Sequence, residues 1–296
     1  MNDKSRVGLR DYLIVGTLLL LLLLVGSFYD YQISLAIYNE NNLPAGLMAG
    51  WGQYPQYLIS ITVGVLLIRF RNPDKKWLCV VEVILGLEAI GFSVRSLLTL
   101  PYNSTPSKPM LASIISGIVV GAAVVILVLL CARKSVINRK QVIILCICLM
   151  VMKYLNWGIL DLIKEAWQRP RMRLLAGNNT VFFQPWYVKG CSVRDALVAS
   201  GVSSEEFRSF PSGHTSDAAM AMIAYFIAGL GQFRKNRKLV FYLSLIWPVT
   251  VAFTRIIMGA HFLTDVTVGF AVSFMLFIAA NEVLSFIEKR QFSRLS

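Results

Sequence analysis

Long apolar runs recur along the chain and are separated by short polar segments. Each is long enough to cross the roughly 30 Å apolar core of a bilayer as a helix of about 20 residues. The eight runs cover approximately residues 12–29, 54–70, 77–99, 110–131, 141–163, 212–232, 239–257 and 262–286. We therefore predict an all-α fold, a polytopic transmembrane bundle of about eight spans.

Composition and charge agree with a membrane protein. Hydrophobic residues make up 56% of the chain and charged residues 15%, and the mean hydropathy of +0.62 is high for a soluble domain. Basic clusters fall on alternate connections: Lys4/Arg6/Arg10, Arg69/Arg71/Lys75/Lys76, Arg133/Lys134/Arg139/Lys140, Arg234/Lys235/Arg237/Lys238 and Lys289/Arg290/Arg294. The connections 30–53 and 101–109 contain a single basic residue between them, Lys108.

This asymmetry predicts the topology. By the positive-inside rule, the basic side and both termini face the cytoplasm of a multi-pass cell-membrane protein. The net charge of +13 is then a topology signal, and no basic stripe interleaved with aromatics indicates nucleic-acid binding. The first run has a basic start and could be a cleaved signal peptide. A retained helix is favoured, because the run is long for that role and no clear small-x-small cleavage site follows.

Polar clusters lie at helix ends that this topology brings to the outer face. The chain has two histidines, and both belong to these clusters. Lys164 closes the fifth predicted helix and precedes Arg169, Arg171 and Arg173; Ser212, Gly213 and His214 open the sixth; Arg255 ends the seventh; His261 and Asp265 open the eighth. The connection 164–211, with a short helix expected around SVRDALVAS before Gly201, is long for a compact membrane protein, and such loops are usually functional.

These residue types suit attack on a phosphoryl group. Positioned cations stabilise the charge that spreads over the phosphoryl oxygens, and a helix N-terminus opening with Ser212 and Gly213 favours an anion. His261 and Asp265 are four residues apart and share a helix face. Asp265 can fix the tautomer of His261 and leave the other ring nitrogen as nucleophile, while His214 can protonate the leaving oxygen.

The sequence also resembles a known family. Lys164-x6-Arg171, Pro211-Ser212-Gly213-His214 and Arg255-x5-His261-x3-Asp265 are similar to the three-part signature of the type 2 phosphatidic acid phosphatase superfamily. The resemblance implies a six-helix core, a phosphohistidine on His261 oriented by Asp265, and His214 as general acid and later base. It also implies that the phosphate is held by Lys164, Arg171, Ser212, Gly213 and Arg255, without a metal or another cofactor.

The first motif departs from the family pattern. Met172 follows Arg171 where proline is usual, and Arg169 carries the Arg-Pro dipeptide instead. Spacing favours Arg171 as the phosphate ligand, with Arg169 second. Pro170 should end the helix, so that Arg169, Arg171 and Arg173 could point the same way on an extended chain.

We therefore predict one integral membrane domain over 1–296, with extra helices in 1–100 and a catalytic core in 110–290 that carries the outer loop 164–211. The expected function is a metal-independent phosphatase acting on a lipid phosphate or diphosphate at the outer leaflet. Phosphatidic acid, phosphatidylglycerol phosphate and undecaprenyl diphosphate all fit. Alternatives are a lipid phosphotransferase of the same family and an anion transporter. The expected partners are the bilayer and the lipid substrate, and the oligomeric state stays open.

Overall fold

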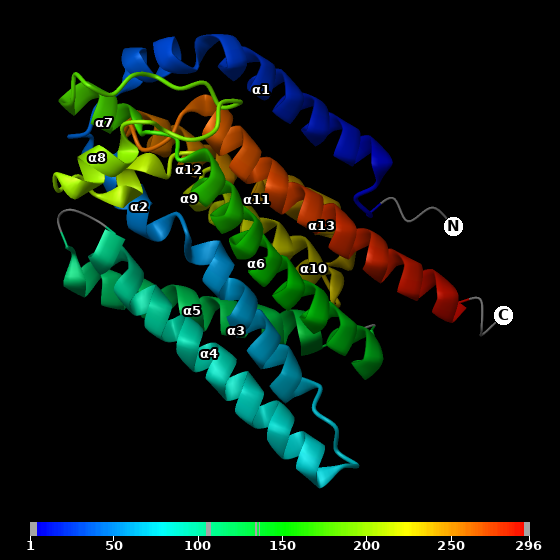
Figure 1. Ribbon diagram of the computed structural model, residues 1–296. Helices are drawn as coiled ribbons and strands as arrows, with labels where there is room; N and C mark the ends of the chain where they lie inside the picture. The colour runs from blue at the N-terminus through cyan, green and yellow to red at the C-terminus, as the bar shows by residue number, and fades with distance from the viewer. Residues whose placement is uncertain (1–4, 105–107, 134, 136, 293–296) are drawn as a thin grey trace.

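The computed structural model describes residues 5–104, 108–133, 135 and 137–292, and within these ranges the chain forms helices, turns and loops without strands (Figure 1). The predicted all-α class is confirmed. Three members of the basic clusters, Lys4, Lys134 and Arg294, lie outside the described residues.

Helical segments occupy all eight predicted spans. The α-helices are α1 (Leu9–Ile37), α2 (Leu43–Trp51), α3 (Tyr54–Arg69), α4 (Lys76–Ser104), α5 (Met110–Arg133), α6 (Arg139–Trp167), α7 (Met172–Gly177), α8 (Arg194–Ala199), α9 (Gly213–Ala219), α10 (Ala224–Gly229), α11 (Arg237–Ser244), α12 (Ile246–Ile257) and α13 (Leu263–Phe292). Short 3-10 helices cover Ser204–Phe207, Met220–Ile223 and Arg234–Asn236.

In the described part of the chain, six segments are long and apolar enough to cross a membrane: Leu9–Ile37, Lys76–Asn103, Met110–Arg133, Arg139–Gly177, Arg234–Ile257 and Leu263–Glu288. The two other predicted spans differ for local reasons. Helix α3 has 16 residues, and the span predicted at 212–232 is divided by the 3-10 turn between α9 and α10. The fold is a polytopic helical bundle in which these two shorter segments are packed inside.

The helices of residues 1–100 are part of this bundle. Helix α1 packs along α13, and α3 packs against α4, α5 and α6. The start of α1 and the end of α13 lie at one end of the bundle, and α7 and α8 lie at the other (Figure 1). We call these the terminal end and the loop end. The division of the domain between residues 100 and 110 stays a prediction.

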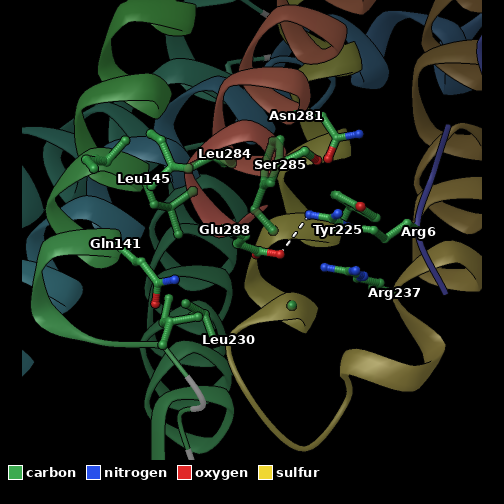
Figure 2. Close-up of a pocket in the computed structure, with 15 residues that line it drawn as sticks. Arg6, Gln141, Leu145, Tyr225, Leu230, Arg237, Asn281, Leu284, Ser285 and Glu288 are labelled. Carbon is green, nitrogen blue, oxygen red and sulfur yellow. Dashed lines mark hydrogen bonds and ion pairs between the residues drawn. The ribbon is translucent and has the colours of Figure 1, made fainter. Parts of the chain in front are cut away.

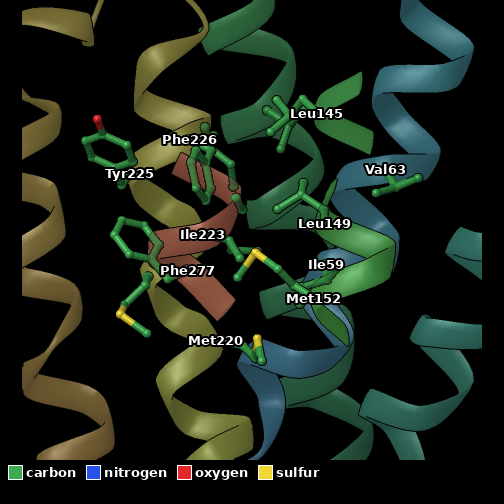
Figure 3. Packing of buried hydrophobic residues seen from close by; sticks show 14 of the residues in the cluster. Ile59, Val63, Leu145, Leu149, Met152, Met220, Ile223, Tyr225, Phe226 and Phe277 are labelled. Carbon is green, nitrogen blue, oxygen red and sulfur yellow. The ribbon is translucent and has the colours of Figure 1, made fainter. Parts of the chain in front are cut away.

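The apolar core lies in the middle of the bundle. Met220 and Phe226 meet Leu149 and Met152 of α6 and Phe277 of α13, and all are buried (Figure 3). Because lipid tails are as apolar as these side chains, close packing rather than transfer from water holds such helices together. The packing fixes α6, α10 and α13 relative to one another. Helix α9, which precedes the 3-10 turn Met220–Ile223 and α10, also packs against α13 and α6, and α6, α9 and α13 carry residues of the candidate site.

The connection 164–211 caps the loop end. Helix α6 ends at Trp167, and Gln168 follows in the left-handed region with φ 49°. Helix α6 thus ends before Pro170, as predicted, because proline has no backbone N–H to continue the helical hydrogen bonds. The predicted short helix before Gly201 is confirmed as α8, and Gly201 has φ 102°, which favours glycine.

Candidate active site

The turn between α12 and α13 places His261 at the loop end. The amides of Ala260 and His261 both donate to the Arg255 carbonyl, at 3.1 and 3.3 Å, and so close the end of α12. Gly259 has φ 59°, a conformation that glycine adopts without steric cost. Its carbonyl accepts from the Arg173 amide at 3.0 Å. Arg255 and His261 are therefore held on one tight turn that is joined to the loop after α6.

The start of α9 is joined to the same turn. The Ser212 amide donates to the Asp265 carbonyl at 2.9 Å, and the Ser212 hydroxyl caps α9 by accepting from the Thr215 amide at 3.3 Å. A Cβ on Gly269 would overlap the Ser212 carbonyl oxygen and lie 3.1 Å from its carbonyl carbon, so this close approach of α13 requires glycine. The Ser212 hydroxyl is thus engaged in the cap, while Gly213 provides the first residue of the helix.

The imidazole of His261 is buried, and its hydrogen-bond partner shows which ring nitrogen carries the proton. Nδ1 lies 2.6 Å from the Ser209 carbonyl oxygen. A carbonyl only accepts hydrogen bonds, so Nδ1 carries the proton and Nε2 keeps its lone pair. Burial lowers the pKa of His261 well below its ordinary value of 6.5, and the nearby charges of Lys164, Arg171 and Arg255 lower it further. The ring is therefore neutral near pH 7.

Asp265 does not contact His261 in the way the i, i+4 spacing suggests. Its Oδ2 lies 3.9 Å from His261 Nδ1, beyond hydrogen-bond reach. The carboxylate instead accepts from the Ser209 hydroxyl at 2.5 Å and from the Phe262 amide at 2.8 Å. Ser209 therefore stands between the two residues, with its hydroxyl on Asp265 and its carbonyl on His261. The expected direct orientation of His261 by Asp265 is replaced by an indirect one.

The second histidine lies beside the first. The ring centroids of His214 and His261 are 6.3 Å apart and the rings are inclined at 54°. His214 is half-buried, in the first turn of α9. The chain's two imidazoles are thus neighbours, as the convergence of helix ends predicts.

Three predicted cations, Lys164, Arg171 and Arg255, lie close enough for their charges to act on both rings. Lys164 donates from Nζ to the Arg208 carbonyl at 2.8 Å. Arg255 is 5% exposed. Arg171 has loose ion pairs with Glu205 and Glu206, at 3.5 and 3.8 Å. Among the described residues, Nε of Arg171 and Nε of Arg255 are buried donors without a hydrogen-bond partner. Because buried donors are usually paired, these two are the natural contacts for the oxygen atoms of an anion.

Arg169 has a different environment from Arg171. It is fully buried, with Nε on the Gln184 carbonyl at 2.7 Å and Nη1 on the Thr264 hydroxyl at 2.9 Å. Its Nη2 lies 3.0 Å from Asp30, and Nη1 also donates to Asp265. The guanidinium carbon is 4.3 Å from the Phe262 ring centroid and 5.3 Å from that of Phe183.

The prediction that Arg169, Arg171 and Arg173 point the same way is wrong. Helix α7 begins at Met172, so the segment is not extended. Arg171 and Arg173 both pair with Glu206, whereas Arg169 turns to Asp30 and Asp265. The arrangement also opposes the second-choice role of Arg169 as a phosphate ligand, because its donors are engaged inside the protein. Arg171 is the arginine that joins the cationic group.

The sequence reasoning missed Asp30, Ser209 and Thr264. The apolar run predicts a first helix that ends near residue 29 and places Asp30 in the connection 30–53, but α1 continues to Ile37. An ionisable residue within a membrane helix is a functional signal in its own right. Ser209 contacts Asp265 through its hydroxyl and His261 through its backbone carbonyl, and for the carbonyl contact no residue type is a signal.

Within the described residues, no group of three or more His, Cys, Asp or Glu side chains could hold a metal ion. Metal-independent chemistry stays a prediction. A cavity at the terminal end is lined by polar residues that include Arg6, Tyr225, Arg237 and Glu288, and Glu288 pairs with Arg6 at 2.7 Å (Figure 2). None of the predicted site residues lines this cavity, so it is not the candidate site.

The fold and site define a helical membrane protein that gathers two histidines and three cations at one end of its bundle. A family model described as the PAP2 superfamily matches residues 141–288, which is half of the chain, and the chain belongs to this superfamily.

Phosphatidylglycerophosphatase B of Bacillus subtilis (strain 168) is 40% identical over 72 residues. The match covers 23% of this chain and 36% of that relative, so the chain matches little more than a third of the relative's length. No solved structure matches.

Proposed function

We propose that the protein is a membrane phosphatase that removes a phosphoryl group from a lipid phosphate or diphosphate through a phosphohistidine. One observation carries this proposal: a buried, neutral imidazole, His261, with its proton held on Nδ1 at 2.6 Å from the Ser209 carbonyl, beside Lys164, Arg171 and Arg255. A neutral ring with a free Nε2 is a nucleophile, and the cations attract an anionic substrate.

In the first proposed step, Nε2 of His261 attacks phosphorus, a nitrogen–phosphorus bond forms and the bond to the lipid oxygen breaks. Burial and the charges of Arg255, Arg171 and Lys164 lower the pKa of His214 well below 6.5 in the protein without substrate, so His214 takes up a proton when the phosphate anion binds and offsets these charges. His214 gives this proton to the lipid oxygen, so that the leaving group departs as an alcohol, or as a lipid monophosphate from a diphosphate. The Nδ1 proton stays on the ring and keeps its hydrogen bond to Ser209. General acid catalysis of this kind contributes about 10²- to 10⁴-fold in rate.

In the second step, the now neutral His214 takes a proton from water, whose oxygen attacks phosphorus. The nitrogen–phosphorus bond breaks, inorganic phosphate leaves, and both histidines return to their starting states. Both steps thus take place between two neighbouring imidazoles, whose ring centroids lie 6.3 Å apart: His261 binds the phosphorus atom, and His214 transfers the protons.

The cations stabilise charge in both steps. Arg171 and Arg255 offer planar groups of donors that match phosphate oxygens, and Lys164 offers a movable point charge. The unpaired buried Nε donors of the two arginines support this assignment. In a site with little water, such fixed donors interact with the transition state more strongly than they would in bulk solvent.

The location of the site supports a lipid substrate at the outer face. The site lies at the loop end, whereas Arg6 and Arg237, which belong to two of the basic clusters, line the cavity at the terminal end together with Glu288. The positive-inside rule then gives cytoplasmic termini and an outer site. A phosphate at helix ends lies at headgroup level, so its acyl or prenyl tail can stay in the bilayer.

The test is phosphate release by the detergent-purified protein from phosphatidic acid, phosphatidylglycerol phosphate and undecaprenyl diphosphate, with EDTA present. The name of the Bacillus relative makes phosphatidylglycerol phosphate the first substrate to try. Release of inorganic phosphate supports the hydrolase. Transfer of labelled phosphate to a second lipid without release would instead identify a phosphotransferase. Binding of phosphate without either reaction would favour the anion transporter.

A further inference from the structure

Helix α1, which precedes the family-matched residues 141–288, reaches into the candidate site through Asp30. The Asp30 carboxylate is 2% exposed. Its Oδ2 accepts from Arg169 Nη2 at 3.0 Å and from the Thr264 hydroxyl, and its Oδ1 accepts from the Thr264 amide at 2.9 Å. Each of its oxygen atoms is therefore fixed by groups that belong to the catalytic half of the chain.

From Arg169 the contacts continue to the proposed nucleophile. Arg169 Nη1 donates to Asp265, whose other oxygen accepts from the Ser209 hydroxyl at 2.5 Å. The Ser209 carbonyl then accepts from His261 Nδ1 at 2.6 Å. These four residues are 1% exposed or less, so water cannot replace a lost partner easily.

We propose that Asp30 is a positioning residue, which holds Arg169 and Asp265 in register and thereby fixes Ser209 and the Nδ1–H tautomer of His261. This inference rests on the proposed role of His261 as nucleophile. Arg169 lies between two carboxylates, and removing the charge of one leaves a buried cation paired only with Asp265. Breaking a buried pair is costly, so the surrounding groups are expected to shift. A shift of Asp265 away from Ser209 would release the carbonyl that holds the ring.

A close helix contact makes this arrangement possible. A Cβ on Gly26 would lie 2.7 Å from Thr264 Cγ2 and 3.0 Å from Asp30 Oδ1. Thr264 is β-branched, and its methyl group has little freedom to move away. Glycine at position 26 therefore lets α1 approach α13 closely enough for Asp30 to reach Arg169.

The principal variant is Asp30→Asn, which has the same shape. Both oxygens of Asp30 face donors, so the amide NH₂ must oppose a donor in either orientation. Asp11→Asn is the matched control. Asp11 lies on the same helix and is 3% exposed, but it binds Tyr242 at 2.6 Å and Lys238 at 2.8 Å, at the terminal end.

The first readout separates kcat from KM. We expect Asp30→Asn to lower kcat about 10- to 100-fold, as misplacement of a reacting group does, with KM within about twofold because the phosphate ligands are unchanged. Asp11→Asn should behave as the wild type. A kcat for Asp30→Asn within about twofold of that of Asp11→Asn would overturn the proposal.

A glycine pair covers the case in which Asp30→Asn fails to fold. Gly26→Ala moves α1 away from Thr264, whereas Gly16→Ala on the same helix meets nothing within 4 Å. Both changes raise helix propensity by about 1 kcal/mol, so only the contact differs. Loss of kcat in Gly26→Ala alone is expected, and equal activity of the two variants contradicts the proposal.

The second readout does not depend on the substrate. The chain has two histidines, so ¹⁵N-histidine NMR of protein without a histidine tag gives two imidazoles, which His214→Gln assigns. Wild-type and Asp11→Asn protein should show His261 as the Nδ1–H tautomer, and Asp30→Asn and Gly26→Ala should add the Nε2–H form. Unchanged His261 signals in both variants overturn the proposal. If the signals change but no lipid phosphate is hydrolysed by the wild type, the proposed function fails while the positioning role of Asp30 stands.

Discussion

Charged groups lie on both sides of His261, but the arginine on one side is fully paired inside the protein and the arginine on the other side is only loosely paired. On one side, Arg169 lies between Asp30 and Asp265, fully buried and hydrogen-bonded through Nε, Nη1 and Nη2. On the other side, Arg171 is 11% exposed and its pairs with glutamates are 3.5 Å or longer. The paired side can hold geometry but offers no donor to a ligand. The loosely paired side has charge and donors to offer.

Arg169 and Arg171 show that residue type does not decide the role. The two are separated by one residue, and the turn after α6 sends them to different partners. What distinguishes them is whether carboxylates of the protein already neutralise the guanidinium. Variants of the loosely paired side should therefore fail in chemistry alone, whereas variants of the paired side should lose stability and, through the position of His261, kcat as well.

The largest effect is expected at the residue between the two sides. His261→Ala should abolish turnover, because no neighbouring group can replace a covalent nucleophile. Rapid-quench experiments with phosphate-labelled lipid should trap an acid-labile, base-stable adduct in the wild type and none in the variant. Size-exclusion chromatography checks that the variant is folded. Hydrolysis by the Ala variant at the normal rate would remove His261 from the mechanism.

Replacing the two arginines should mainly affect different quantities, kcat/KM for Arg171 and stability for Arg169. Arg171→Ala should lower kcat/KM about 10²- to 10³-fold with little change in Tm, because it removes a donor to the developing charge. Arg169→Ala should destabilise the protein by about 3–5 kcal/mol, because it leaves two buried carboxylates without their cation. Thermal unfolding in detergent and steady-state kinetics on both variants measure the split. A stable, inactive Arg169→Ala beside a fully active Arg171→Ala would reverse the assignment.

Much of the fold can be predicted from the sequence, because each membrane helix is a continuous apolar run. The alternation of basic connections then places Lys164, His214, Arg255 and His261 at one end, and the structure brings these residues together. The partners of Arg169 do not follow. Asp30 lies 139 residues away in the chain, in a helix that continues to Ile37, beyond the apolar run that predicts it.

The orientation of His261 could not be predicted for a different reason. Helical spacing places Asp265 near the ring, and it is near, at 3.9 Å. The turn before α9 inserts Ser209, whose carbonyl takes the Nδ1 position. A backbone carbonyl is the same in every residue, so only the path of the loop decides where it points.

The next effect concerns inhibitors and the cationic side. Vanadate adopts the five-coordinate geometry of phosphoryl transfer, so it should compete with substrate, and His261→Ala should weaken its binding. EDTA should leave activity unchanged, because Lys164, Arg171 and Arg255 supply the positive charge. Inhibition constants with and without EDTA measure both effects. Loss of activity in EDTA that Mg²⁺ restores would contradict the metal-independent mechanism.

The smallest effect is a change in the pKa of His261. Burial is the largest cause of its lowered pKa, and the charge of Lys164 is the next. Lys164→Met keeps the apolar stem and removes the charge, so the pKa of His261 should rise while staying below its ordinary value of 6.5. The ring then becomes protonated at higher pH, and the loss of the neutral nucleophile, seen as the acid limb of kcat/KM, should move to higher pH as well.

The measurement is a ¹⁵N NMR titration of the two histidines. Lys153→Met is the matched control, because Lys153 is also a lysine of α6 but bonds to Ser60 at 2.7 Å and is not among the main charges that lower the pKa of His261. Its removal should leave the pKa of His261 in place. If both lysine variants shift that pKa equally, the effect comes from changed packing rather than from the charge of Lys164. An unchanged or lower pKa in Lys164→Met would show that the lysine lies too far from the ring to act as a phosphate ligand beside it.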